Sequence, residues 1–214
     1  MKVKIFEFNP IGENTYVAYD ETKECVIIDP GCFFPDEKAH LLNFILDNDL
    51  VVNHLLNTHL HFDHVFGNNF IYEQFHLETE ANKGDEFLLE QMPKQLQMFG
   101  FDGEEVTQIP KIGKYLNEND IVTFGNQKLI VLQVPGHSPG SIVFYNQDAG
   151  CVFVGDVLFR GSVGRTDLAG GNQQQLITGI KEKLLTLPAE TVVYSGHGPL
   201  TTIGEEIRSN FYLQ

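Results

Sequence analysis

The sequence predicts an α/β fold, because segments with strand-like alternation are interleaved with segments that have helical spacing of apolar residues. A second observation supports this class: polar clusters follow directly after apolar strand segments, where α/β folds commonly place their sites. The 214 residues suit a single domain spanning 1–214, and 42% hydrophobic residues are enough to bury an ordinary core.

The first third of the chain has the pattern of strands joined by tight turns. Proline and glycine in 9–14 and in Asp29-Pro30-Gly31 predict turns, and residues 20–24 predict a hairpin loop. Apolar residues at helical spacing predict a helix over 36–48. Strands are predicted at 2–8, 15–19, 25–28 and 51–56.

The rest of the chain repeats this alternation. Helices are predicted over 83–99 and 173–187, and the stretch 101–119 is rich in turn residues. Strands are predicted at 121–124, 128–134, 141–145, 151–154 and 191–194.

Charge and composition exclude several classes of partner. The formal net charge of −15 argues against broad contact with nucleic-acid phosphates, which requires clustered lysine and arginine. No apolar run approaches the roughly 18 residues of a membrane span, and the first residues do not resemble a signal peptide. The three cysteines, Cys25, Cys32 and Cys151, form no CxxC pair and fit a reducing compartment. We therefore expect a cytoplasmic protein without nucleic-acid or membrane partners.

Three histidines and an aspartate lie within six residues, at His59, His61, Asp63 and His64. Imidazole and carboxylate are ligands for zinc, iron and manganese. In an extended segment His59, His61 and Asp63 share one face, and a turn near His64 would let the segment serve two ions. Burying these groups without a metal would cost roughly 1–3 kcal/mol for each unpaired group. The segment is therefore predicted to bind metal.

Three further candidate ligands follow predicted strands: His137, Asp156 and His197. In each case a glycine precedes the polar residue, which permits a tight turn and a close approach of the backbone. The isolated histidines are expected to be ordinary core or surface residues: His40, His54 and His76.

The segment Thr58-His59-Leu60-His61-Phe62-Asp63-His64 resembles the THxHxDH signature of the metallo-β-lactamase superfamily. The three later candidates match the remaining ligands of that family in order, and Asp29-Pro30-Gly31 resembles its early DxG turn. This resemblance spans nearly the whole chain. It implies a four-layer αβ/βα sandwich.

The resemblance also implies two divalent metal ions, with zinc as the first expectation and iron or manganese as alternatives. The first ion would have three histidine ligands: His59, His61 and His137. The second would have one carboxylate and two histidines: Asp63, His64 and His197. Asp156 would bridge the two ions.

Within the superfamily the chain looks most like single-domain glyoxalase II-like hydrolases, also called hydroxyacylglutathione hydrolase-like. Residues 155–159 and 161–167 resemble their GDxLF and GxxGRTD segments, and 209–213 resembles their Asn-Pro-aromatic-Leu ending without its proline. Class B β-lactamases often carry cysteine near the position of Asp156 and are exported, and flavo-di-iron proteins carry glutamate at that of His61. Full glyoxalase II enzymes hold glutathione with a C-terminal helical domain, whereas 17 residues follow His197 here. The thiol carrier therefore stays open.

The expected reaction is hydrolysis of a thioester by a metal-bridging hydroxide. Metal binding lowers the pKa of water from 15.7 to about 7, and a metal stabilises the oxyanion that forms on the attacked carbonyl. Asp63 and Asp156 are the expected catalytic residues, with Asp63 orienting the hydroxide as well as binding metal. A thiolate leaves without a strong general acid. Ser138 and Ser141 lack the context of a nucleophile elbow.

Arg165 is the candidate for gripping a substrate carboxylate, with an ion pair to Asp167 or Asp156 as the open alternative. Phe159 is expected to line the substrate pocket, as is Arg160. Three other functions stay open: a persulfide dioxygenase with one iron, a lactonase, and a non-catalytic metal-dependent binding protein. The iron of the dioxygenase would be held by the equivalents of His59, His137 and Asp156. The metal, the acyl group and the oligomeric state are not determined by the sequence.

Overall fold

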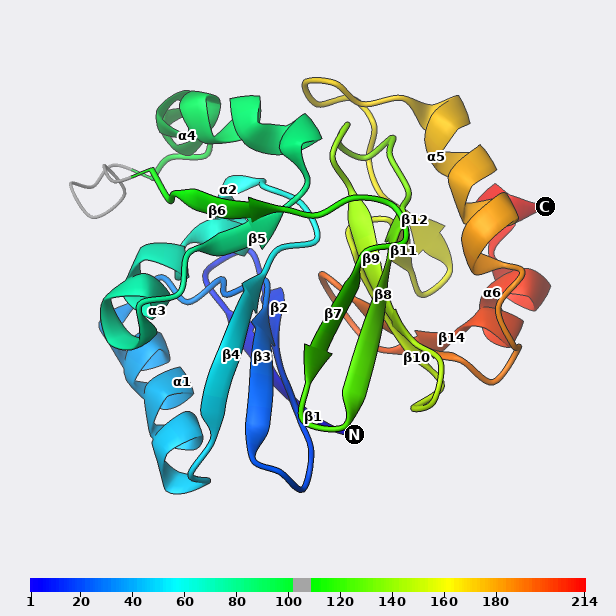
Figure 1. Cartoon of the computed structure of the whole chain (residues 1–214). Helices are drawn as coiled ribbons and strands as arrows, with labels where there is room; N and C mark the ends of the chain where they lie inside the picture. Colours follow the sequence, from blue (N-terminus) through cyan, green and yellow to red (C-terminus); the bar gives the residue numbers. More distant parts are fainter. Residues whose placement is uncertain (102–108) are drawn as a thin grey trace.

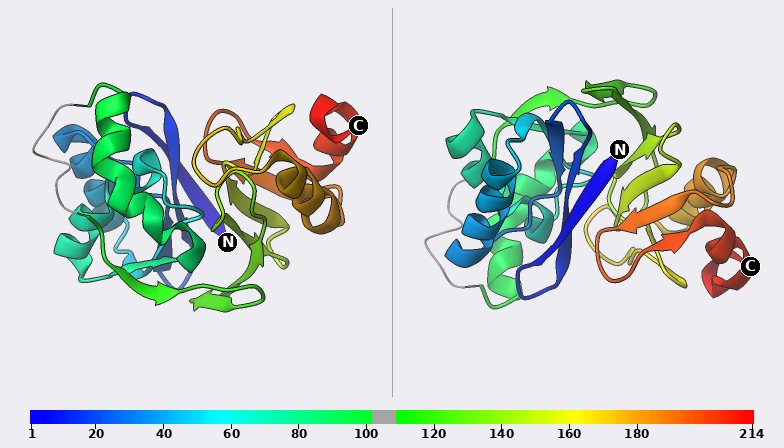
Figure 2. Two further views of the ribbon diagram at one scale, coloured as in Figure 1. Left: turned by 90° about the horizontal axis from the view of Figure 1, so that it is seen from above. Right: turned by 90° about the horizontal axis from the view of Figure 1, so that it is seen from below.

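The computed structural model describes residues 1–101 and 109–214. Two six-stranded β-sheets pack against each other in the middle, and helices cover the outer face of each sheet (Figure 1). Views from above and below show the order helices, sheet, sheet, helices (Figure 2). The predicted four-layer αβ/βα sandwich is confirmed. Among the described residues, no helix has the length and apolar character needed to cross a membrane.

The first sheet has the strand order β1-β2-β3-β4-β5-β6. Its strands are β1 (Lys2–Phe8), β2 (Glu13–Tyr19), β3 (Glu24–Ile28), β4 (Val51–Leu56), β5 (Thr79–Ala81) and β6 (Ile112–Tyr115). The first three strands pair antiparallel, and each later strand pairs parallel with its predecessor. The carboxyl ends of β3, β4 and β5 therefore meet at one edge, which collects the loops that follow them.

The second sheet has the strand order β14-β13-β10-β9-β8-β7. Its strands are β7 (Ile121–Phe124), β8 (Gln127–Gln133), β9 (Ile142–Asn146), β10 (Cys151–Gly155), β13 (Val192–Ser195) and β14 (Thr201–Thr202). Only β10 and β13 pair parallel among these neighbours. A small hairpin of β11 (Leu158–Phe159) and β12 (Ser162–Val163) follows β10.

Helices α1, α3 and α4 lie on the side of the first sheet, and α5 and α6 lie on the side of the second (Figures 1 and 2). The helices are α1 (Pro35–Asp47), α2 (Phe62–Val65), α3 (Asn68–Phe75), α4 (Glu86–Met98), α5 (Gln173–Gly179) and α6 (Ile203–Ser209). Short 3-10 turns are η1 (Lys83–Asp85) and η4 (Phe211–Leu213). In α1, Pro35 occupies the first turn, and Leu41 and Ile45 are buried one turn apart, as an amphipathic helix requires.

The main core lies between the two sheets. Its large buried side chains come from both sheets and include Tyr16, Leu56, Phe124, Phe144 and Phe153. Each fully buried side chain of this size contributes roughly 1.5–3 kcal/mol by leaving water. This packing fixes the position of one sheet relative to the other, so that loops from both sheets can build one site.

All nine predicted strands are present, with bounds within two residues of those expected. The prediction of a turn-rich stretch over 101–119 is wrong for Ile112–Tyr115, which forms edge strand β6 by pairing with β5. Residues 102–108 of that stretch lie outside the described residues. The predicted helix over 173–187 ends its α-helical part at Gly179 and continues as the π-helical turn η3 (Ile180–Leu184). The sequence analysis also missed α3, β5 and α6, because these short elements depend on packing more than on local pattern.

Asp20 joins the two sheets near the end of β2. Its carboxylate accepts hydrogen bonds from the backbone and hydroxyl of Thr22, from the backbone of Asn126 (2.8 Å) and from the side chain of Gln127 (3.1 Å). Asn126 and Gln127 belong to the turn between β7 and β8. Burial alone would raise the pKa of Asp20, but the hydrogen bonds from these three residues lower it from 3.8 to about 2.

Asp20→Asn is expected to lower the free energy of unfolding at pH 7 by about 1–2 kcal/mol. Because the pKa is lower in the folded state, the carboxylate stabilises the fold above its ordinary pKa of 3.8. That contribution is lost as the pH falls through about 2. Urea unfolding from pH 7 to pH 3 should show the difference shrinking below about pH 4. Asp148→Asn, at an exposed position between β9 and β10, is the charge-matched control. A difference that is independent of pH would contradict this interpretation.

Candidate metal centre

The polar residues predicted from strand ends lie together at one edge of the sandwich. The segment from Asn57 to His64 follows β4 of the first sheet. His137 follows β8, Asp156 follows β10, and His197 follows β13 of the second sheet. The site is therefore built between the two sheets, by loops that the core holds in place.

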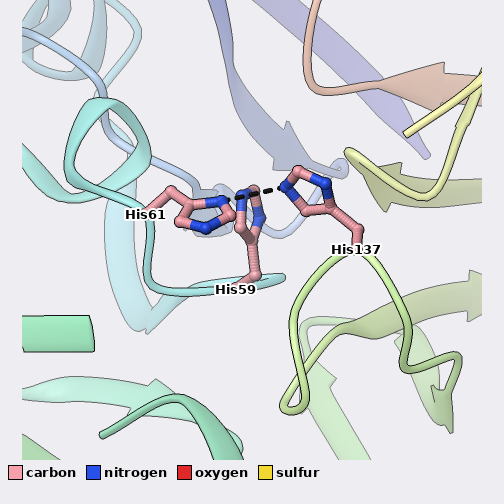
Figure 3. A group of neighbouring side chains, drawn as sticks. All are labelled: His59, His61 and His137. Atoms are coloured by element: carbon pink, nitrogen blue, oxygen red, sulfur yellow. Dashed lines mark hydrogen bonds between the residues drawn. The ribbon is translucent and has the colours of Figure 1, made fainter. Parts of the chain in front are cut away.

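Three histidines form the first potential ligand group. One ring nitrogen from each of His59, His61 and His137 lies within 4.8 Å of the others. Figure 3 shows the three rings converging from two separate loops, with a contact of 2.9 Å between His61 Nδ1 and His137 Nε2. All three residues are buried. The first of the two sets expected from the resemblance is thus brought together.

A carboxylate and two histidines form the second group. Atoms from Asp63, His64 and His197 also lie within 4.8 Å of one another. Asp63 Oδ2 is 3.3 Å from His197 Nε2 and 3.7 Å from His64 Nε2. The chain turns at this point because α2 begins at Phe62, and this turn brings Asp63 and His64 together with His197 while the ring of His64 stays 4.1 Å from that of His59. The second expected set is therefore also brought together.

Asp156 lies between the two groups. Its Oδ2 is 3.6 Å from His137 Nε2 in the first group and 3.7 Å from His197 Nε2 in the second. Its Oδ1 is 3.4 Å from His64 Nε2. The preceding Gly155 has a φ of +50°, and a Cβ atom there would lie 2.1 Å from Thr58 Oγ1. A glycine is therefore needed to turn the chain and place this carboxylate.

Backbone carbonyls fix the orientation of two of the rings. His137 Nδ1 is 2.8 Å from the carbonyl oxygen of Arg165, and His197 Nδ1 is 3.0 Å from that of Gly12. Since a carbonyl oxygen can only accept, Nδ1 carries the proton in both rings. The lone pair of each Nε2 consequently faces the centre, which is the tautomer that binds metal.

Asp29 follows β3 of the first sheet and holds the histidine segment in place by hydrogen bonds. Its carboxylate accepts from the backbone of Thr58 (2.7 Å) and from the hydroxyl of Thr58 (2.6 Å), and it lies 3.3 Å from His64 Nδ1. Because the Thr58 hydroxyl donates to Asp29, it accepts from His59 Nδ1 at 3.1 Å. Asp29 also lies within 4.8 Å of His59 and His64 as a third potential ligand group. Its oxygens are occupied by Thr58, so its role is to position these residues.

The local electrostatics favour the metal-binding forms of His59, His61 and Asp156. At His64 and His197 burial opposes the charged form, but the carboxylates of Asp63 and Asp156 raise the pKa of both rings. Burial lowers the pKa of His59 well below its ordinary value and lowers that of His61 to about 3. Burial would raise the pKa of Asp156, but the positive charges of His64, His197 and His137 hold that pKa well below its ordinary range. Neutral imidazoles and ionised carboxylates are the protonation states that metal ions bind.

Several buried atoms at the centre have no hydrogen-bond partner among the described residues: His59 Nε2, His61 Nε2, His64 Nε2 and Asp156 Oδ1. Each would cost roughly 1–3 kcal/mol if it stayed unpaired. A mixed set of imidazole nitrogens and carboxylate oxygens suits zinc, iron or manganese. These residues therefore fit divalent metal ions.

Asp85 is a structural part of the centre that the sequence analysis missed. Its Oδ2 accepts from the backbone of Leu60 (3.1 Å) and the hydroxyl of Ser138 (2.7 Å), and its Oδ1 accepts from the backbone of Gly140 (2.6 Å). One buried carboxylate thus ties the histidine segment to the loop that carries His137. The only sequence signal is an aspartate near the start of a predicted helix, which is common at helix starts.

Glu13 was missed as well. It is fully buried, and its Oε2 accepts from the hydroxyl of Thr15 at 2.8 Å. Its Oε1 lies 3.9 Å from His64 Nδ1. Burial raises the pKa of Glu13 well above its ordinary value. Nothing in its neighbourhood in the sequence indicates this position behind the second group.

The centre opens into a pocket of 390 Å³. Its lining residues are Ile11, His61, Phe62, Asp63, Gln91, Gln95, Phe99, His137, Asp156, Arg165, Asp167, Leu168, Ala169 and His197. Arg165 lies in the pocket as expected, but its guanidinium forms two hydrogen bonds of 2.7 Å with the carboxylate of Asp167. The open alternative for this arginine, an ion pair with Asp167, is therefore present.

Phe159 does not belong to the lining of this pocket. The hairpin of β11 and β12 pairs it with Ser162 and holds its ring 6.4 Å from that of His197. Arg160 lies at a separate surface hollow beside Leu200 and Glu205. The sequence analysis expected both residues in the pocket, but neither is among the described residues that line it.

The three isolated histidines lie away from the centre. His40 packs on the ring of Phe6, His54 Nδ1 hydrogen-bonds to Glu80, and His76 ends α3 with a left-handed φ of 59°. None of them belongs to a potential ligand group in the described part of the chain.

Sequence comparison places this geometry in a known family. The family model described as metallo-β-lactamase superfamily matches residues 9–197. The chain is 36% identical over 220 residues to the hydroxyacylglutathione hydrolase GloC of Haemophilus influenzae, covering 100% of this chain and 98% of that protein. It is 39% identical over 216 residues to the probable metallo-hydrolase YqgX of Bacillus subtilis, with the same two coverages.

Comparison with solved structures supports the same family. The structure of BLEG-1 B3 metallo-β-lactamase matches with a TM-score of 0.87 and 34% identity, covering both chains fully. TTHA1623 in a di-iron-bound form matches with a TM-score of 0.85 and 36% identity, over 98% of this chain and 100% of that one. ETHE1 from Myxococcus xanthus matches with a TM-score of 0.79 and 28% identity, over 99% of this chain and 84% of that one. The chain thus belongs to the metallo-β-lactamase superfamily of metal-dependent hydrolases.

Proposed function

We propose that this chain hydrolyses thioesters with the help of two divalent metal ions. The observation that carries the proposal is the set of buried ligand atoms without a protein partner, which belong to both groups and to the aspartate between them. A single ion would leave part of this set unpaired. Zinc is the first candidate for both ions, with iron or manganese as alternatives.

Each group would hold one ion. The first would be held by His59, His61 and His137, and the second by Asp63, His64 and His197. Asp156 contacts residues of both groups and would be shared between the ions. When bound, a pair of divalent ions supplies Lewis acidity and a reactive nucleophile at neutral pH.

The side chains of the pocket orient the reactants. The carboxylate of Asp63 lines the pocket and is positioned to accept a hydrogen bond from the attacking water. His137 and His197 keep fixed orientations through their bonds to backbone carbonyls. The apolar side chains of Ile11, Phe62 and Phe99 give part of the pocket an apolar lining.

The lining of the pocket favours a leaving group that needs no proton. Apart from the candidate ligands, its titratable described residues are Arg165 and Asp167. The hydrogen bond from Arg165 lowers the pKa of Asp167 to about 2, so neither residue can donate a proton near pH 7. A thiol has a pKa near 8.5 and leaves as a thiolate, whereas an amine must be protonated. This comparison favours thioesters over amides, and the similarity to hydroxyacylglutathione hydrolase GloC supports the same class.

The test combines metal analysis with turnover. We expect about two metal ions per chain, in line with the two ligand groups. We also expect hydrolysis of S-lactoylglutathione or another thioester, measured as the loss of thioester absorbance. His59→Ala should lower kcat/KM at least about 100-fold by removing a ligand. His40→Ala, an exposed histidine on α1, is the matched control and should keep full activity. Turnover by the native protein no faster than that of His59→Ala would refute the proposal.

A lactone and a β-lactam should be tested as substrates beside the thioester. Hydrolysis of only one of these two compounds, without hydrolysis of the thioester, would show that the protein is a hydrolase of another class.

The second candidate is the persulfide dioxygenase with a single iron that the sequence resemblance left open, and the similarity to both GloC and ETHE1 does not decide between the two reactions. In that case His59, His137 and Asp156 would hold the iron. The unpartnered Nε2 of His64, in the other group, argues against this candidate. Iron at one ion per chain, together with oxygen-dependent formation of sulfite from a persulfide, would establish the dioxygenase and exclude the hydrolase.

A further inference from the structure

The part of the pocket wall that helix α4 forms has a distinct chemistry. Helix α4 contributes Gln91 and Gln95, one helical turn apart, and Phe99 follows the end of the helix. Leu168 and Ala169 line another part of the same pocket. The wall thus offers apolar surface interrupted by two carboxamides.

The apolar part is held in place by an aromatic cluster. The Phe62 ring lies 5.1 Å from Phe99, 5.5 Å from Phe66 and 5.8 Å from Phe101, measured between ring centroids. Phe33 joins the cluster at 4.7 Å from Phe66. Rings packed at such distances stabilise one another, so Phe62 and Phe99 present a preformed surface to a ligand.

The two glutamines are open for hydrogen bonding. Neither side-chain amide forms a hydrogen bond with another described residue, and Gln95 is half-buried beside the pocket. Each carboxamide offers two N–H donors and one carbonyl acceptor, which is the complement of a secondary amide. A ligand that carries amide groups along α4 would satisfy both residues.

The pocket offers no unpaired cation. Outside the candidate metal ligands, its only basic described residue is Arg165, and both hydrogen bonds of that guanidinium go to Asp167. No lysine lines the pocket, and residues 102–108, which the structure does not describe, contain neither lysine nor arginine. The chain as a whole carries a net charge of −15. Lys94 lies on α4 but not in the pocket lining, so carboxylates or phosphates on a substrate would meet no free positive partner among the described side chains that line the pocket.

We infer that the thiol arm of the substrate is uncharged and carries amide groups that Gln91 and Gln95 recognise, because the described lining of the pocket has no free cation to pair with a carboxylate. This inference rests on the proposed thioester hydrolysis. It selects neutral carriers of the N-acylcysteamine type over glutathione, which has two carboxylates, and over carriers with phosphates.

The first test keeps the acyl group constant and changes only the thiol arm. The probes are S-lactoyl-N-acetylcysteamine, S-lactoylglutathione and the diethyl ester of S-lactoylglutathione. We expect kcat/KM for the first and third probes to exceed that for S-lactoylglutathione by about 10-fold, because an unpaired carboxylate opposes binding. The diester is the sharper comparison, since it shares the peptide arm and lacks only the two negative charges.

Two sets of variants test the residues. Asp167→Asn releases the guanidinium of Arg165, so it should raise kcat/KM for S-lactoylglutathione about 5-fold and leave that of its diester unchanged. Asp148→Asn removes the same charge at a remote exposed position and should raise kcat/KM for neither of these two substrates.

The double variant Gln91→Ala and Gln95→Ala should raise KM for S-lactoyl-N-acetylcysteamine about 10-fold. It should have no such effect on S-lactoylethanethiol, which has no amide. Gln97→Ala, on α4 but outside the pocket lining, is the control for that helix.

The outcomes separate the two proposals. If S-lactoylglutathione is hydrolysed as well as its diester or better, thioester hydrolysis stands and the inference about the thiol arm is wrong. If the double glutamine variant affects the amide-bearing and amide-free probes equally, recognition by these glutamines is wrong. If no thioester is hydrolysed by metal-loaded protein, the proposed function fails and the inference fails with it.

Discussion

Replacing Asp156 with alanine is expected to lower kcat/KM for a thioester by at least about 1,000-fold, because several kcal/mol of transition-state stabilisation depend on the paired ions. The carboxylate lies within 3.4–3.7 Å of ring nitrogens of His64, His137 and His197. Without it, three imidazoles that face one another would lose the negative charge between them. Metal content should fall from about two ions per chain to one or fewer, since Asp156 contacts residues of both ligand groups.

The measurement pairs steady-state kinetics with elemental analysis of protein purified without added metal. Asp156→Asn keeps the shape of the side chain and removes its charge, so it should lose nearly as much activity while folding as the native chain does. Circular dichroism checks the fold of both variants. Asp148→Ala, an exposed aspartate between β9 and β10, should retain activity and metal. Two ions per chain and at least a tenth of the native kcat/KM in Asp156→Ala would show that this carboxylate is not shared between ions.

Replacing Asp85 with alanine is expected to cost about 3 kcal/mol of unfolding free energy, because three buried donors lose their acceptor. Those donors are the backbone N–H groups of Leu60 and Gly140 and the hydroxyl of Ser138. The same change frees the segment of His59 and His61 from the loop of His137. We therefore expect metal affinity to fall by about 10–100-fold, as is typical when residues that orient metal ligands are removed.

Urea unfolding of chelator-treated protein isolates the effect on the fold, and metal titration of the folded protein gives the effect on affinity. Asp85→Asn keeps one carbonyl acceptor and should lose about half as much stability. Asp148→Ala again serves as the control. A stable Asp85→Ala variant with native metal affinity would mean that packing alone aligns the two loops.

The strands and the ligand residues could be predicted because both depend on local pattern. Strands have a side-chain period of two, so strands such as Lys2–Phe8 and Val51–Leu56 can be found without knowing their neighbours. Edge strand β6 could not, because its existence depends on pairing with β5, a strand of three residues. The spacing of His59, His61, Asp63 and His64 likewise lies within one short segment.

The substrate pocket was harder to predict. Arg165 and Asp167 are two residues apart, and the sequence left open whether the arginine would bind substrate or pair with an aspartate. The structure pairs them by two hydrogen bonds. Gln91 and Gln95 lie in a predicted helix, yet only the packing of α4 over the histidine segment makes them part of the pocket.

The sequence by itself determined the class of the fold and the set of donor atoms offered to metal, because periodicity and short motifs are properties of neighbouring residues. The tertiary structure decided which donors share a group, since His137 and His197 reach the centre from loops of the second sheet. It also decided the position of Asp85, whose three partners are up to 55 residues away in the chain. Such contacts depend on how the two sheets pack and on where their loops then meet, and no local pattern contains that information.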